Sequence, residues 1–93
     1  MGVIENKIAI ITGGGGGIGG AVAARFVKEG ARVAVADIDA NAARTRVAAL
    51  AATGSDVIAV ETDVPLKRSV LAMVQLVLDR WGRIDILVTD ENR

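Results

Sequence analysis

The sequence predicts an α/β fold built on a parallel sheet, and three observations indicate it. Four short apolar runs alternate with three segments of helical periodicity, beginning and ending on an apolar run. The apolar runs do not alternate with polar residues, which is typical of strands covered by helices on both faces. Glycine or proline stands beside most of the junctions between runs and helical segments.

The four predicted strands are short and rich in β-branched side chains, so at this length a strand is favoured over a buried helix. They span Ile8–Ile11, Arg32–Ala36, Val57–Val60 and Ile84–Val88, the last interrupted by Asp85. With a strand order of 3-2-1-4 and right-handed crossovers, the first two helices cover one face and the third covers the other. The prediction is therefore a three-layer α/β/α sandwich.

Each of the three predicted helices carries an apolar stripe at helical spacing. They span Ile18–Glu29, Ala40–Ala52 and Leu66–Trp81. Gly30 and Gly82 stand where C-terminal caps are expected, and Pro65 fits the start of the third helix. Arg44 and Arg46 on the second helix are expected to lie on its solvated face.

The bulk composition describes one partial domain over residues 1–93 and excludes several functions. Hydrophobic residues make up 52% and charged residues 24%, which excludes a disordered chain. Eleven basic and eleven acidic residues cancel, so nothing indicates a nucleic acid or an anionic membrane as partner. The absence of cysteine and histidine excludes disulfides, thiol nucleophiles and Cys/His zinc sites. Without a signal-peptide pattern or a bilayer-length apolar run, we expect a soluble, cytoplasmic protein.

A run of glycines between the first strand and first helix is the strongest functional signal. Residues 12–20 read TGGGGGIGG. The start of a helix offers free N–H groups and a positive dipole end, which together hold an anion if side chains are absent. We expect Gly13 to make the turn, Gly17 to admit a pyrophosphate and Gly19 to let the helix pack closely. The alternative is a glycine turn that binds nothing.

The spacing of these glycines narrows the class of nucleotide site. No lysine lies in the loop and no Gly-Lys-Ser/Thr follows, which excludes an ATP- or GTP-binding P-loop. Gly-x-x-x-Gly-x-Gly after Thr12 resembles the cofactor signature of the short-chain dehydrogenase/reductase family, over about Lys7 to Val88. This resemblance implies a Rossmann-type fold. The cofactor-binding residues that it implies in the loop are Gly13, Gly15, Gly16, Gly17, Ile18 and Gly19.

An acidic residue after the second strand favours NAD over NADP. Asp37 lies about twenty residues past the glycines, where a carboxylate accepts the ribose hydroxyls and repels a 2′-phosphate. Ile38 follows, and no cation stands there or in the loop, where NADP-binding relatives carry one. The alternative is that Asp37 or Asp39 only caps the second helix.

Asp63 and Val64 follow the third strand, and the resemblance implies that this pair contacts the adenine ring. From the residues alone, a turn or cap aspartate is an equal alternative. Asp37, Asp39, Asp63 and Asp85 do not indicate a metal site, because neither histidine nor a dedicated ligand loop accompanies them.

The resemblance breaks after Val88. The family continues Asn-Asn-Ala-Gly, whereas residues 89–93 read TDENR. Its catalysis uses a serine, a tyrosine and a lysine with a supporting asparagine, and this chain has no tyrosine. We therefore predict no catalytic residue, and expect a truncated, inactive NAD-binding half of an oxidoreductase that transfers hydride between NAD and an alcohol or carbonyl.

Two other functions stay open. A non-enzymatic module could bind a nucleotide or a partner, because the fourth strand and the third helix would be left uncovered; a homo-oligomer or a complementing chain would then form there. An S-adenosylmethionine-binding Rossmann domain also uses glycines after its first strand. The glycine spacing and the Asp63-Val64 pair argue against that domain.

Overall fold

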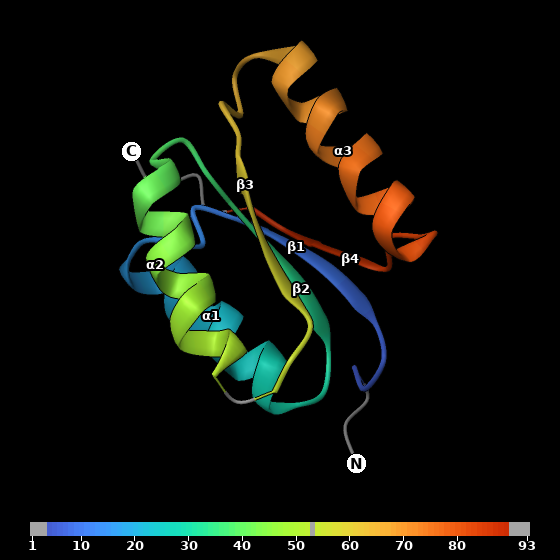
Figure 1. Ribbon diagram of the computed structural model, residues 1–93. Coiled ribbons are helices and arrows are strands. Elements are labelled where there is room, and N and C mark those ends of the chain that lie inside the picture. Colours follow the sequence, from blue (N-terminus) through green and yellow to red (C-terminus); the bar gives the residue numbers. More distant parts are fainter. Residues whose placement is uncertain (1–3, 53, 90–93) are drawn as a thin grey trace.

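Four parallel strands form a central sheet in the order β3-β2-β1-β4. The computed structural model describes residues 4–52 and 54–89. In chain order the elements are β1 Ile8–Thr12, α1 Gly17–Lys28, β2 Arg32–Asp37, α2 Ala40–Ala51, β3 Val57–Glu61, α3 Lys67–Trp81 and β4 Ile86–Val88. Helices α1 and α2 lie on one face of the sheet and α3 lies on the other (Figure 1). The predicted three-layer architecture and strand order are confirmed.

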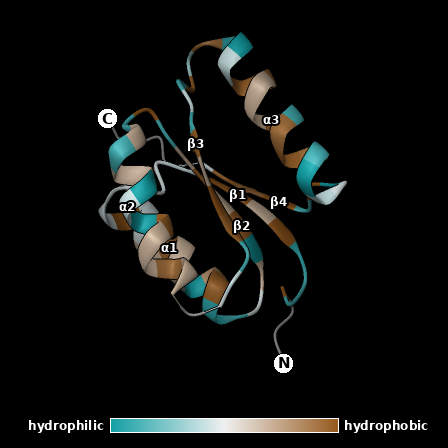
Figure 2. Cartoon of the chain, viewed as in Figure 1, coloured by the Kyte–Doolittle hydropathy of each residue, from teal (hydrophilic) through white to brown (hydrophobic). Residues whose placement is uncertain are grey.

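The sheet separates two apolar layers, because neighbouring side chains on a strand point to opposite faces. On the α1 and α2 side, Ile11, Val33 and Val35 pack with Val27 and Leu50. On the α3 side lie the side chains of Ile8, Ile10, Ala34, Ala36, Val60, Met73 and Val77. The hydrophobic colour along the strands, enclosed by the helices, follows this arrangement (Figure 2). Strand β1 is buried throughout, as the continuous apolar run predicts.

The bounds of the elements match the sequence prediction within one residue, except at the start of β4. Ile84 and Asp85 precede the strand. The Asp85 carboxylate accepts hydrogen bonds from the Ile8 backbone N–H at 2.9 Å and from Arg83 Nε at 3.0 Å. These two bonds lower the pKa of Asp85 below its usual value, the bond from Ile8 more strongly. Asp85 therefore ties the start of β4 to the start of β1 instead of extending the strand.

The carboxylate of Asp56 fixes the end of α3 beside the start of β3. It accepts hydrogen bonds from Arg80 Nη2 at 2.7 Å and from the Trp81 indole Nε1 at 2.8 Å. Arg32 Nε lies 3.9 Å away and adds a weaker attraction. The bond from Arg80, followed by that from Trp81, holds the pKa of Asp56 below its usual 3.8. The link joins residues far apart in the sequence and sets the position of α3 along the sheet.

Strand β4 forms one edge of the sheet, and apolar side chains stand exposed around it. Leu87 is 59% exposed, although it is level with buried Ile10 of β1. Leu71, Leu76 and Leu78 of α3 are also exposed. The described part of the chain therefore leaves the sheet edge and part of α3 uncovered, as expected from the sequence.

Candidate functional site

The residues predicted to bind a cofactor gather at one edge of the sheet. Strands β1, β2 and β3 run parallel, so their carboxyl ends meet there. The glycine loop follows β1, Asp37 ends β2, and Asp63 lies two residues beyond β3. The Thr62 N–H donates to the Asp37 backbone oxygen at 2.9 Å and carries the pairing of β2 and β3 to this edge.

The glycine loop makes a tight turn that places the start of α1 against the end of β1. Gly13 has φ of 69°, a conformation that residues with side chains rarely adopt. The Gly16 N–H donates to the Gly13 carbonyl oxygen at 3.1 Å and closes the turn. A Cβ on Gly19 would overlap that same carbonyl group. The close packing expected of Gly19 is therefore present, and it depends on the missing side chain.

The start of α1 is open to solvent from Gly16 to Ile18. Its N-cap, Gly16, has no side chain to cap it, and the turn contains no acidic residue. Gly16 and Gly17 are exposed, and a Cβ on Gly17 would meet nothing within 4 Å. A helix start of this kind presents N–H groups to an anion, so the chemistry of these donors fits a cofactor phosphate.

Asp37 holds the glycine loop in place. Its Oδ2 accepts a hydrogen bond from the Gly15 N–H at 3.0 Å, and its Oδ1 accepts one from the Asp39 N–H at 3.0 Å. A carboxylate has about four acceptor positions, so each oxygen retains one for a ribose hydroxyl. The hydrogen bond between Asp37 and Gly15 cannot be predicted from the sequence, because it joins two segments that only the fold brings together.

The helix-cap alternative is decided in favour of Asp39. Its Oδ1 accepts the Ala42 N–H at 3.1 Å, so Asp39 is the N-cap of α2. Asp37 lies ahead of that cap and serves the loop instead. The two aspartates, which look interchangeable in the sequence, therefore have separate roles.

Three large apolar side chains stand exposed around this edge. Ile18 is 67% exposed, Ile38 is 64% exposed and Val64 is 46% exposed. They belong to the three segments that follow β1, β2 and β3. Apolar side chains at such positions suit the faces of a flat ring.

Asp63 forms part of the turn between β3 and α3. Its N–H donates to Ser69 Oγ at 2.8 Å, and its carbonyl oxygen accepts the Leu66 N–H at 2.9 Å. Within residues 4–52 and 54–89, its carboxylate has no hydrogen-bond partner. The backbone of Asp63 therefore makes the turn, and the half-buried carboxylate stays available to a ligand.

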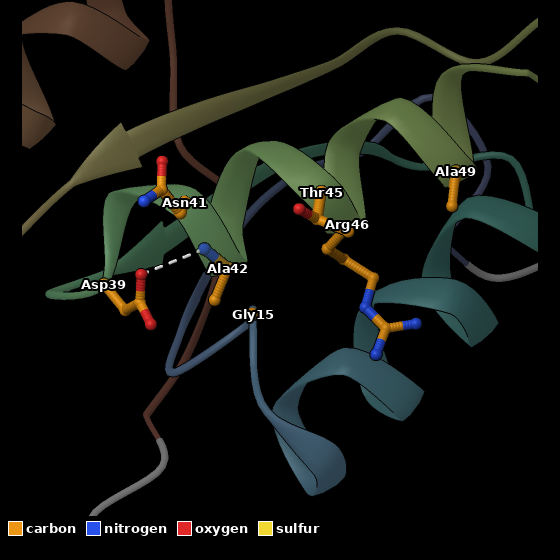
Figure 3. Close-up of a pocket in the computed structure, with 7 residues that line it drawn as sticks. All are labelled: Gly15, Asp39, Asn41, Ala42, Thr45, Arg46 and Ala49. Carbon is orange, nitrogen blue, oxygen red and sulfur yellow. Dashed lines mark hydrogen bonds between the residues drawn. The ribbon is translucent and has the colours of Figure 1, made fainter.

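The expectation that Arg46 lies on a solvated face is wrong. Arg46 is half-buried, and its side chain crosses from α2 toward α1 (Figure 3). A Cβ on Gly20 would meet its guanidinium, so the missing side chain at Gly20 makes room for it. Gly15 also lies close to α2, because a Cβ there would lie 2.8 Å from Ala42. Neither contact is predicted from the sequence. The one hint of the first contact is Gly20 itself, which offers room for a side chain from another helix.

The match to known proteins agrees with this geometry. A family model described as short chain dehydrogenase matches residues 7–90. The chain belongs to the short-chain dehydrogenase family. Sorbitol dehydrogenase of Cereibacter sphaeroides is 47% identical over 87 residues, which are 94% of this chain and 33% of that protein. The chain spans about a third of the length of the curated relatives it matches.

Solved structures of short-chain dehydrogenases have the same fold. A short-chain dehydrogenase/reductase from Burkholderia phymatum, in complex with NAD, superimposes with a TM-score of 0.89 at 36% identity, covering 94% of this chain and 31% of that one. A hydroxysteroid dehydrogenase from Escherichia coli superimposes with a TM-score of 0.93 at 34% identity, covering 97% of this chain and 38% of that one.

Across the described residues, no helix could cross a membrane, and no three His, Cys, Asp or Glu side chains are grouped to hold a metal.

Proposed function

We propose that this chain binds NAD and is the cofactor-binding part of an oxidoreductase that transfers hydride between NAD and an alcohol or carbonyl. The observation that carries the proposal is the arrangement around Asp37. Its carboxylate accepts the Gly15 N–H two residues before α1 begins, and Ile18, Ile38 and Val64 are exposed in the segments that follow β1, β2 and β3. The relative from Burkholderia phymatum was solved with NAD.

Each part of the site has a role in this proposal. The N–H groups at Gly17 and Ile18 bind the pyrophosphate, whereas the Gly16 N–H closes the turn onto Gly13, and Gly13 and Gly19 give the loop its shape. Gly15 presents its N–H to Asp37, so its part is to position that carboxylate. The nicotinamide of a bound cofactor would supply the hydride acceptor.

The adenosine half of the cofactor is assigned to the ends of β2 and β3. Asp37 accepts the ribose hydroxyls, Ile38 and Val64 cover the adenine faces, and the carboxylate of Asp63 accepts from the ring's amino group. We propose a preference for NAD over NADP, because the Asp37 carboxylate repels a 2′-phosphate. This chain's residues bind and orient the cofactor, and we assign no catalytic step to them.

Calorimetric titration of NAD into the chain tests the proposal. Gly17→Val places a branched side chain where the pyrophosphate is proposed to approach, and no neighbouring atom lies within 4 Å of its Cβ to disturb the fold. Ala21→Val adds the same side chain one turn later on an exposed position of α1 and is the matched control. We expect NAD binding to the wild type and to Ala21→Val, and its loss in Gly17→Val. A folded wild type that does not bind NAD would contradict the proposal.

The exposed apolar surface favours a second proposal, which concerns a partner. Leu87 on the edge strand and the exposed leucines of α3 would be covered by a second copy of the chain or by a complementing chain.

An S-adenosylmethionine site is not favoured by any contact described above. The single-domain organisation over 1–93 and the cytoplasmic location stay predictions from the sequence.

A further inference from the structure

Arg46 differs from Arg25, Arg44, Arg80 and Arg83, because its guanidinium has no partner among the residues that the structure describes. Arg25 pairs with Glu29, Arg80 with Asp56 and Arg83 with Asp85. Arg44, two residues before Arg46 on α2, donates to Asn41 Oδ1. Of the residues whose structure is described, none makes a hydrogen bond or ion pair with Arg46. A half-buried guanidinium without a partner is unusual, since such groups are generally paired.

Arg46 lines a groove that begins at the proposed cofactor site. The groove has a volume of about 470 Å³ and lies between the glycine loop and α2 (Figure 3). Gly15 forms one wall, and Thr45 and Arg46 form another. Gly15 also donates its N–H to Asp37, so the groove and the proposed ribose position share a residue. Asp39 lines the groove too, and one of its oxygens is occupied by the cap of α2.

We infer that this groove accepts a phosphate monoester beside Asp37, with Arg46 as the cation that binds it. The inference rests on the proposed function, because the phosphate would be the 2′-phosphate on the ribose that Asp37 holds. A guanidinium matches phosphate oxygens with paired donors, and the Thr45 hydroxyl adds another. The attraction of Arg46 offsets part of the repulsion from Asp37. The preference for NAD is then smaller than the sequence around Asp37 indicates.

Two small nucleotides that differ only in the 2′-phosphate test this inference without needing a nicotinamide pocket. Adenosine 5′-monophosphate and adenosine 2′,5′-bisphosphate are titrated calorimetrically into the wild type, Arg46→Gln and Arg44→Gln. The two variants lose the same charge from the same helix. We expect Arg46→Gln to weaken bisphosphate binding about tenfold and monophosphate binding less than about twofold. Arg44→Gln should change neither affinity by more than about twofold.

The alternatives give different results. Equal weakening of both nucleotides by Arg46→Gln would mean that Arg46 only packs α2 against α1, and would overturn the inference, as would no effect on either. Arg46→Lys keeps the charge and should recover most of the bisphosphate affinity, and melting curves report whether each variant is folded. Inorganic phosphate is also added as a competitor, with chloride at equal ionic strength as the control. If phosphate weakens the binding of the bisphosphate more than that of the monophosphate, the result supports the same site. A folded wild type that binds neither nucleotide contradicts the proposed function itself, whereas intact monophosphate binding with no Arg46 effect contradicts only this inference.

Discussion

The Asp37 carboxylate accepts the Gly15 N–H at 3.0 Å and thereby joins the end of β2 to the loop that follows β1. Asp37 therefore has two roles, because the carboxylate that holds the loop is also proposed to bind the ribose. The loop on which the phosphate site depends is therefore coupled to the residue that is proposed to select the cofactor. Changes at Asp37 should alter both affinity and the stability of the loop.

Replacing Asp37 by asparagine should weaken NAD binding about tenfold and narrow its preference over NADP. The amide has one acceptor oxygen in place of two, and it no longer repels a 2′-phosphate. Asp39→Asn is the charge-matched control, since asparagine is an equally good N-cap for α2. Titrations of NAD and NADP into both variants measure the effect. Equal losses in the two variants would show that charge alone, and not the position of Asp37, determines affinity.

Gly19→Ala should destabilise the chain by about 1–3 kcal/mol, because the new Cβ would overlap the Gly13 carbonyl group and push α1 from the loop. Gly17→Ala is the control within the same turn, since its Cβ has open space and its effect should stay within about 0.5 kcal/mol. The midpoint of urea unfolding measures both. Similar midpoints for the two variants would contradict the close packing of α1 on the loop.

The hydrogen bonds that Asp56 accepts from Arg80 and Trp81 should stabilise the folded chain only at pH values at which the carboxyl group of Asp56 is ionised. Because its hydrogen bonds lower the pKa of Asp56 in the folded chain, the stabilisation is complete above the unfolded value of 3.8 and is lost as the pH falls through the folded value. The difference in unfolding free energy between the wild type and Asp56→Asn should therefore be constant near neutral pH and shrink below pH 3.8. Asp79→Asn is the matched control, since in the described part of the chain the Asp79 side chain accepts a single, exposed hydrogen bond, from Gln75. A difference that does not change down to pH 2 to 3, about one unit below the usual value, would contradict this assignment.

Leu87→Lys should reduce self-association at high protein concentration. Leu87 is 59% exposed on the edge strand, where a lysine blocks pairing with another strand. Leu76→Lys adds the same charge to one of the exposed leucines of α3, which belong to the same proposed surface, and should also reduce self-association. Sedimentation velocity of the three proteins measures the effect. A wild type that stays monomeric at high concentration would contradict the proposed partner surface.

Much of the fold could be predicted because the patterns that encode it are local. The continuous apolar run of β1 indicated a strand covered on both faces, and all its residues are buried. The sequence predicts a start of β4 that is two residues too early, since Ile84 looks like a strand residue and only the contact between Asp85 and Ile8 shows where pairing begins. The glycine loop could be recognised by its spacing, yet the same spacing says nothing about what lies against Gly15 or Gly20.

The sequence by itself determined the order of strands and helices, the position of the glycine loop after β1 and the acidic residue at the end of β2. Hydrophobic period, glycine spacing and β-branched content are properties of neighbouring residues, so they can be read without the fold. Only the tertiary structure decided that Asp39 caps α2 while Asp37 holds the Gly15 N–H, and that Arg46 reaches α1 over Gly20. The physical reason is that these contacts join segments on different elements, and how closely two elements approach depends on the packing of the whole sheet and its helices.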